Sequence, residues 1–268
     1  DSVLTVQDER IKTAIRAGWD AMSESYQADS AISESDVHYA PFAPGERHYR
    51  LLGDFRGKRV LELACGGAQN SIALSSWGAD VVALDISPNQ LAYARTLQVK
   101  SGQSFDLITG DMAAPLMFRP GSFDIVLSAF GWEFIPDLGA CVANCANLLR
   151  PGGQLLMATV HPLTAFDWDM GRSTLLVTDY FNPPVEVWEE PVPEGHSLGL
   201  TFFRTIEELV GSVTKAGLVL QALLEPYPLG PDRVAESPYA GRYWADHKER
   251  LERVPFAVVI SARKPLAG

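Results

Sequence analysis

The stretch from Lys58 to Asp85, KRVLELACGGAQNSIALSSWGADVVALD, most constrains what this chain can fold into. It opens with an apolar run around Glu62, which predicts a strand buried on both faces. The small residues from Cys65 to Ala68 then allow a sharp turn whose backbone can lie close to a ligand. A helix pattern, a glycine and a second apolar run follow, and the run ends at Asp85. The segment therefore predicts strand, tight turn, helix and strand.

This βαβ unit has the layout of a nucleoside site. A carboxylate at the tip of the second strand, here Asp85, can accept both hydroxyls of a ribose, and the turn faces the same crevice. A dinucleotide site is disfavoured, because it needs G-x-G-x-x-G to seat a pyrophosphate and the run here is Ala64-Cys65-Gly66-Gly67-Ala68. An ordinary buried βαβ turn without a ligand is the alternative.

The pattern E-x-[GA]-C-G-x-[GA], from Glu62 to Ala68, resembles motif I of the class I S-adenosylmethionine-dependent methyltransferases. In that family the turn holds the methionine part of the cofactor, and the acid after the second strand holds the ribose. Ala64 and Ala68 stand where the family often has glycine, a difference of one methyl group each. The resemblance covers the chain from about residue 20 to the end. It implies S-adenosylmethionine as cofactor and S-adenosylhomocysteine as product.

The resemblance also implies the fold. We expect an α/β, Rossmann-like, seven-stranded and mostly parallel sheet with helices on both faces, an antiparallel last strand and an inserted lid. Beyond the first two strands, apolar runs predict strands over residues 105–109, 123–129, 154–160, 218–224 and 256–262. We divide the chain into an N-terminal helical cap segment, residues 1–50, and a methyltransferase domain, residues 51–268. Helices are expected over 1–35 and 47–55, with Trp19 only packing the first helix on the domain.

Residues 162–204 differ from the rest of the domain in being rich in both aromatic residues and prolines. The segment is too aromatic for a disordered linker, and its prolines exclude a long helix. We expect it to form a lid over the substrate, with a short strand over residues 184–189. An interface between subunits would explain the same aromatic residues.

The resemblance places cofactor contacts at the ends of successive strands. Asp111 can accept a hydrogen bond from the adenine amine and Met112 can pack on its ring, although Asp111 could also cap a turn. An aromatic residue near Tyr26 often closes over the methionine end in the family, and packing of the helix on the domain is the alternative. The expected cofactor contacts are Tyr26, Glu62, Ala64, Cys65, Gly66, Asp85, Ile86, Gln90, Asp111, Met112 and Ser128.

Candidate substrate-binding residues are His38, Phe130, Trp132 and Trp168. His38 lies in a loop between breaks, and Phe130 and Trp132 follow the fourth strand at the switch point of the sheet. A solvent-facing or capping role for His38 and core roles for the two aromatic residues are the alternatives. His161 directly follows the fifth strand, and its ordinary pKa near 6.5 suits a general base at the crevice. A histidine that fixes the following loop by hydrogen bonds is the alternative.

The net charge and the composition of the chain limit which kinds of binding partner are expected. A net charge of -11 and the lack of a basic footprint argue against nucleic acid. The three cysteines form no disulfide framework, and Cys141 and Cys145 lack the further ligands that a metal site needs, so we expect them to pack as small apolar groups. No apolar run reaches the length of a membrane span and no signal-peptide pattern is present. We expect a cytoplasmic monomer or homodimer without a metal.

These features together predict a methyltransferase. It would transfer the sulfonium methyl of S-adenosylmethionine in line to an oxygen or nitrogen of a small organic acceptor, in specialised metabolism. Holding donor and acceptor in line within a water-poor pocket supplies most of the acceleration in such a reaction. Two alternatives stay open: a protein that binds the cofactor but transfers nothing, and a nucleotide-dependent oxidoreductase, which the missing G-x-G-x-x-G disfavours. The sequence does not identify the acceptor.

Overall fold

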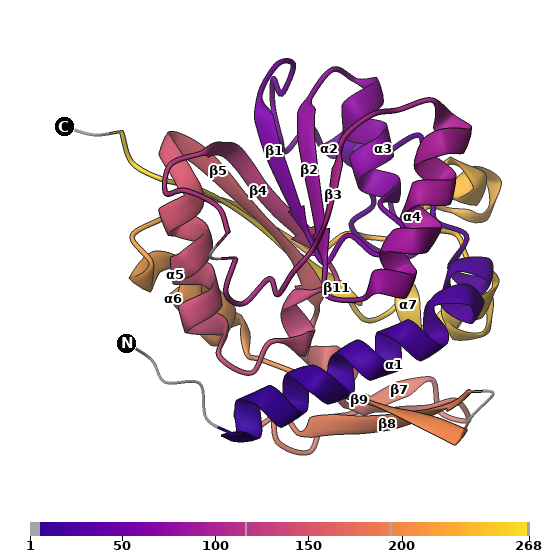
Figure 1. Ribbon diagram of the computed structural model, residues 1–268. Coiled ribbons are helices and arrows are strands. Elements are labelled where there is room, and N and C mark those ends of the chain that lie inside the picture. The colour runs from indigo at the N-terminus through magenta and orange to yellow at the C-terminus, as the bar shows by residue number, and fades with distance from the viewer. Residues whose placement is uncertain (1–5, 116, 193–194, 267–268) are drawn as a thin grey trace.

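A computed structural model describes residues 6–115, 117–192 and 195–266. These residues build a seven-stranded sheet in the order β10-β11-β5-β4-β1-β2-β3 (Figure 1). Neighbours among β1 to β5 pair in parallel, and β11 runs antiparallel to both β5 and β10. The expected Rossmann-like sheet with its antiparallel last strand is therefore confirmed. The strands are β1 (Arg59–Leu63), β2 (Asp80–Asp85), β3 (Asp106–Thr109), β4 (Phe123–Ala129), β5 (Leu149–Val160), β10 (Val219–Leu224) and β11 (Ala257–Arg263).

Helices cover both faces of the sheet. Val82 and Leu84 of β2 belong to the core layer shared with α5 (Leu138–Leu148) and α6 (Ile206–Lys215). Ala83, between them, packs on the other face against α4 (Pro88–Ser101), where α3 (Gln69–Ser76) also lies. Because side chains alternate along a strand, both faces of β2 are buried, and this explains its unbroken apolar sequence. Cys141 and Cys145 of α5 are fully buried, which confirms that they pack as small apolar groups.

Local capping chemistry sets where the helices begin and end. The Ser87 side chain accepts a hydrogen bond from the backbone N–H of Gln90, and Pro88 occupies the first position of α4. Thr205 and Glu208 form a capping box at the start of α6. Gly217 follows α6 with φ +79°, a conformation that favours glycine and ends the helix.

The largest departures from the sequence-based expectations lie in the N-terminal segment and at β5. The helix expected over residues 1–35 is α1 (Val6–Ser30), and residues 1–5 lie outside the described residues. The helix expected over residues 47–55 is only α2 (Glu46–Tyr49), because Arg50 adopts a left-handed conformation with φ +53°. Strand β5 begins at Leu149 and not at Gln154, since Leu149 already pairs with Phe123 ahead of a register shift.

The insertion at residues 162–204 folds into small antiparallel sheets. After a short 3-10 helix, η2 (Pro162–Ala165), β6 (Asp167–Asp169) pairs with β7 (Thr174–Leu176), and β8 (Val185–Val192) pairs with β9 (Gly195–Phe202). The strand expected over residues 184–189 is thus confirmed within β8. Helix α1 runs between the sheet domain and the β8–β9 hairpin (Figure 1). A lid function for the insertion stays a prediction.

Several of the connections between strands of the large sheet contain short helices. One 3-10 helix, η1 (Trp132–Phe134), follows β4. Between β10 and β11 lie η3 (Pro231–Glu236), η4 (Arg242–His247) and α7 (Lys248–Leu251). In the described part of the chain, no helix combines the length and the apolar character that crossing a membrane requires.

Candidate functional site

The turn between β1 and α3 has an unusual backbone. Ala64, Gly66 and Ala68 all have positive φ, at 50°, 53° and 58°. A side chain with a Cβ disfavours this region, and each such alanine costs about 1 kcal/mol or more. In the sequence, the two alanines differ from the glycines of the family motif by one methyl group each, and this difference does not reveal their backbone conformation. The turn lines a pocket at the carboxyl ends of the parallel strands.

Asp85 is held rigidly at the tip of β2. Its Oδ2 accepts a hydrogen bond from the Gly66 N–H and its Oδ1 accepts one from the Ser87 N–H, both at 2.8 Å. Burial raises the pKa of Asp85 to about 6, while the backbone hydrogen bonds act in the opposite direction. Each carboxylate oxygen keeps a second lone pair. Asp85 can therefore accept hydroxyl groups of a ligand without losing its backbone partners.

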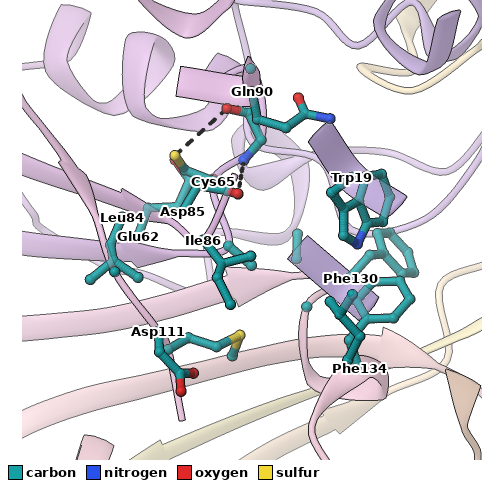
Figure 2. A pocket seen from close by; sticks show the side chains of 18 of the residues that line it. Trp19, Glu62, Cys65, Leu84, Asp85, Ile86, Gln90, Asp111, Phe130 and Phe134 are labelled. Atoms are coloured by element: carbon teal, nitrogen blue, oxygen red, sulfur yellow. Dashed lines mark hydrogen bonds between the residues drawn. The ribbon is translucent and has the colours of Figure 1, made fainter. Parts of the chain in front are cut away.

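The pocket has a polar side and an aromatic side. Figure 2 shows Glu62, Cys65 and Asp85 on one side and aromatic rings, among them Trp19 and Phe130, on the other. Glu62 is buried and accepts a hydrogen bond from the Ser71 hydroxyl. Burial raises the pKa of Glu62 to about 7 and also raises that of the Cys65 thiol, which keeps the thiol protonated at neutral pH.

Helix α1 is fastened along the mouth of this pocket by polar contacts. Lys12 Nζ lies 2.6 Å from Asp111 Oδ2, in an ion pair that is mostly shielded from solvent. Further along, the Gln27 amide donates to Gln90 Oε1 at 2.8 Å and accepts from the Gln69 amide at 2.6 Å. Lys12 and Gln27 both line the pocket. Sequence reasoning missed them, because polar residues on a helix ordinarily face solvent.

The residues present fit the cofactor that the sequence resemblance implies. Gln90 Nε2 is buried, lines the pocket, and finds no hydrogen-bond partner among the described residues. A buried donor of this kind needs an acceptor, which a ligand carboxylate or hydroxyl can supply. Asp85 offers an acceptor for hydroxyl groups nearby, and the Gly66 backbone allows close approach. S-adenosylmethionine carries both carboxylate and hydroxyl groups.

The structure brings most of the expected cofactor contacts together. Ser128 is the exception: it is fully buried behind the pocket. His38 and Phe130, expected at the substrate, line this same pocket, and so does Trp19, which was expected only to pack. The expected contacts that line the pocket are Tyr26, Glu62, Ala64, Cys65, Gly66, Asp85, Ile86, Gln90, Asp111 and Met112.

Two aromatic residues expected at the substrate lie elsewhere. Trp132 is fully buried in the core, where its Nε1 donates to the Ser128 carbonyl at 3.1 Å. Trp132 lines neither this pocket nor the second cavity described below, so the core alternative describes it. Trp168 lies on β6 of the insertion and lines neither this pocket nor the second cavity described below.

His161 has both ring nitrogens engaged. Its Nδ1 accepts a hydrogen bond from the Leu163 N–H at 3.1 Å, which leaves the proton on Nε2, and Nε2 lies 2.9 Å from Glu225 Oε1. Burial lowers the pKa of His161, although Glu225 opposes this shift. The ring therefore fixes the loop after β5 and lines neither cavity. These contacts match the alternative in which His161 fixes the following loop.

A second cavity, of about 540 Å³, adjoins the pocket. The two share the side chains of Trp19 and Tyr26 from α1 and of Phe134 from η1. Its remaining walls come from other residues of α1 and η1, from the end of β5 and η2, from the β8–β9 hairpin, and from the segment between β10 and β11. Sequence reasoning missed this cavity, because its walls come from segments far apart in the chain and carry no common motif.

Comparison with known proteins gives a sequence match over part of the chain. Residues 61–157 match a family model described as methyltransferase domain. The ubiquinone biosynthesis O-methyltransferase of Azotobacter vinelandii is 36% identical over 116 residues, which cover 43% of this chain and 48% of that protein. The protein of the same name from Pseudomonas aeruginosa is 37% identical over 107 residues, covering 39% and 45%. The chain thus spans about half the length of the curated relatives it matches.

Solved structures are similar over more of the chain. An S-adenosylmethionine dependent methyltransferase from Mesorhizobium loti has a TM-score of 0.63 and 22% identity, covering 81% of this chain and 95% of that one. The [4+2]-cyclase SpnF has a TM-score of 0.62 and 17% identity, covering 94% and 95%. At these identities the likeness shows the fold.

Proposed function

We propose that this chain, which carries a methyltransferase domain of the class I S-adenosylmethionine-dependent type, transfers a methyl group from that cofactor to an oxygen of a small organic acceptor. The observation that carries the proposal is the pocket lined by a buried carboxylate, Asp85, and by an unpartnered amide donor, Gln90, beside a second cavity. Two adjoining cavities suit a reaction with two substrates.

The residues of the pocket have distinct roles in this proposal. Asp85 would accept the ribose hydroxyls, Gln90 would donate to a polar group of the cofactor, and Met112 would pack on the adenine. When bound, S-adenosylmethionine supplies an electrophilic methyl group. The aromatic rings that separate the two cavities would exclude water from the point of transfer.

The choice of oxygen rests on the relatives. Those quoted above are named O-methyltransferases, so they favour oxygen over nitrogen as the accepting atom. A hydroxyl acceptor must lose a proton during transfer, and this requires a base near the acceptor. A neutral amine needs little such help.

Calorimetric titration with S-adenosylmethionine, S-adenosylhomocysteine and NAD tests the proposal. We expect both adenosyl ligands to bind and NAD not to bind, and we expect Asp85→Ala to weaken the binding by about tenfold or more. Asp80→Ala is the matched control, because Asp80 is an exposed aspartate at the opposite end of the same strand. Binding of NAD, or equal binding by wild type and Asp85→Ala, would contradict the proposal.

A second candidate is a protein that binds the cofactor but transfers nothing. The observation that favours it is the likeness, over 94% of the chain, to a structure named as a [4+2]-cyclase, since this fold also occurs in a protein with that name. In that case S-adenosylhomocysteine would bind as above, but no acceptor would cause its formation from S-adenosylmethionine. Formation that depends on the acceptor distinguishes the two functions.

A further inference from the structure

Aromatic side chains from three parts of the chain line the second cavity. Trp19 and Tyr26 come from α1, Trp188 from β8, and Tyr239 and Trp244 from the segment between β10 and β11. The rings meet edge to face, with centroids 6.5 Å apart for Trp19 and Trp188 and 5.7 Å apart for Tyr239 and Trp244. Such walls favour a planar ring, which can stack against some of them and meet others edge-on.

The charged side chains around the cavity are mainly acidic. Asp29, Glu133 and Glu186 contribute carboxylates, and Arg250 and His247 are the basic residues among the described lining. Nη2 of the Arg250 guanidinium donates to three backbone carbonyls at 3.0–3.3 Å, and three carboxylates stand against its single positive charge. A ligand carboxylate would therefore meet more repulsion than attraction here. The cavity suits a ligand without one.

Glu133 lines the second cavity. It belongs to η1, beside Phe134, whose side chain lines both cavities. Its side chain is almost fully buried, and Oε2 accepts a hydrogen bond from the Thr159 hydroxyl at 3.0 Å. A buried carboxylate at this position can take a proton from a ligand in the cavity.

The groups that face Glu133 leave it as the proton acceptor. Tyr26 of α1 and Tyr239 both feel its charge, and burial raises the pKa of each phenol above its ordinary value, so both stay protonated at neutral pH. Arg204 contributes the opposing positive charge. Burial nevertheless raises the pKa of Glu133 to about 7, so that near neutral pH it can both accept and release a proton.

We propose that the second cavity is the acceptor site, that it takes a planar aromatic hydroxyl compound without a carboxylate, and that Glu133 receives the hydroxyl proton. This rests on the proposed function. The acceptor O–H bond breaks and its proton passes to the Glu133 carboxylate, while an oxygen electron pair forms the new bond to the methyl carbon. The electron pair of the broken sulfur–carbon bond stays on sulfur, so atoms and electrons balance.

Binding of two matched probes tests the site and the ligand class. We would titrate the protein, saturated with S-adenosylhomocysteine, with 2-naphthol and with 6-hydroxy-2-naphthoate, which differ by one carboxylate. We expect 2-naphthol to bind about tenfold more tightly, and Trp188→Ala to weaken its binding by about tenfold while leaving S-adenosylhomocysteine affinity unchanged. Trp168→Ala is the matched control, a tryptophan of the same insertion that lines neither cavity.

The catalytic role of Glu133 is tested with Glu133→Gln. We expect wild-type methylation of 2-naphthol to slow as the pH falls through about 7, because protonated Glu133 cannot accept a proton. The variant should turn over about a hundredfold more slowly and lose this pH step, yet bind 2-naphthol as wild type does. Glu189→Gln, on the exposed surface of β8, is the control.

Each result supports or overturns a specific part of the proposal. The ligand class is overturned if 2-naphthol does not bind measurably, or if 6-hydroxy-2-naphthoate binds as tightly as 2-naphthol. Equal 2-naphthol affinity in wild type and Trp188→Ala overturns the site. An unchanged rate and pH profile in Glu133→Gln overturns the role of the carboxylate. Failure of S-adenosylhomocysteine itself to bind would instead refute the proposed function, and it is measured separately.

Discussion

The close packing around Gly131 gives a strict test of the cofactor pocket. A Cβ added at Gly131 would lie 2.6 Å from Ala64 Cβ, 2.7 Å from Ser128 Oγ and 3.1 Å from Met112 Sδ. The backbone of Gly131, with φ -121°, is open to alanine, so the cost of Gly131→Ala is steric. The crowded groups include the turn after β1 and the residue expected beside the adenine.

The expected loss of stability follows from two opposing effects. Overpacking a buried site costs about 1–3 kcal/mol, and replacing glycine at a compatible backbone position returns about 0.4–1 kcal/mol through the unfolded state. We therefore expect Gly131→Ala to lower the free energy of unfolding by about 1–2 kcal/mol, which corresponds to a Tm lower by about 2–8 °C. Displacement of Ala64 should weaken S-adenosylhomocysteine binding by about tenfold.

Thermal unfolding and calorimetry on three variants check this reasoning. Gly211→Ala is the control, because among the described residues no heavy atom outside its chain neighbours and the nearby backbone of α6 lies within 4 Å of the added Cβ, and alanine should stabilise α6 by up to about 1 kcal/mol. Adding Ala64→Gly to Gly131→Ala removes the nearest clashing atom and should restore at least part of the loss. A Gly131→Ala protein as stable as wild type, or no recovery in the double variant, would refute the packing argument.

Three further predictions concern individual polar contacts. Lowering the pH through about 6 should weaken S-adenosylhomocysteine binding, because Asp85 then gains a proton; calorimetry between pH 5 and 8 should show this step in wild type and not in Asp85→Asn. Glu46→Ala should lower the free energy of unfolding in urea by about 3 kcal/mol, since the buried carboxylate accepts hydrogen bonds from the Tyr39 hydroxyl and two backbone N–H groups; a loss below about 1 kcal/mol would contradict this. Lys12→Ala removes the ion pair with Asp111 and should speed amide hydrogen exchange in α1, measured by mass spectrometry; unchanged exchange would show that this contact does not fasten the helix.

Most of the sheet could be predicted from the sequence because its determinants are local. A parallel strand buried on both faces reads as an apolar run, and β4 was expected with the bounds that the structure shows, Phe123–Ala129. The starts of α4 and α6 were likewise set by nearby caps at Ser87 and Thr205. Asp85 and Gly66 could be predicted as neighbours, since a βαβ unit brings the turn and the strand tip to one crevice.

The residues that sequence reasoning misplaced depend on distant contacts. His161 does follow a central strand, as expected, but Glu225 on a different part of the chain engages its outer nitrogen. Trp132 follows the switch point, yet it turns into the core. Glu133, its neighbour, was passed over, because one acid beside two aromatic residues carries no motif, and only the position of η1 beside the second cavity gives it significance.

The shared wall between the two cavities provides a route by which binding in one can affect binding in the other. Trp19 and Tyr26 of α1 line both cavities, and the same helix is fastened to the sheet domain through Lys12 and Gln27. A ligand that changes the position of α1 from one cavity changes the affinity of the other by some factor, and thermodynamic linkage makes that factor equal in both directions. The factor by which S-adenosylhomocysteine changes the affinity of the acceptor must therefore equal the factor by which the acceptor changes the affinity of S-adenosylhomocysteine. A factor above one would mean that the cofactor pocket helps to build the acceptor site through α1, which the polar contacts along the helix make physically reasonable.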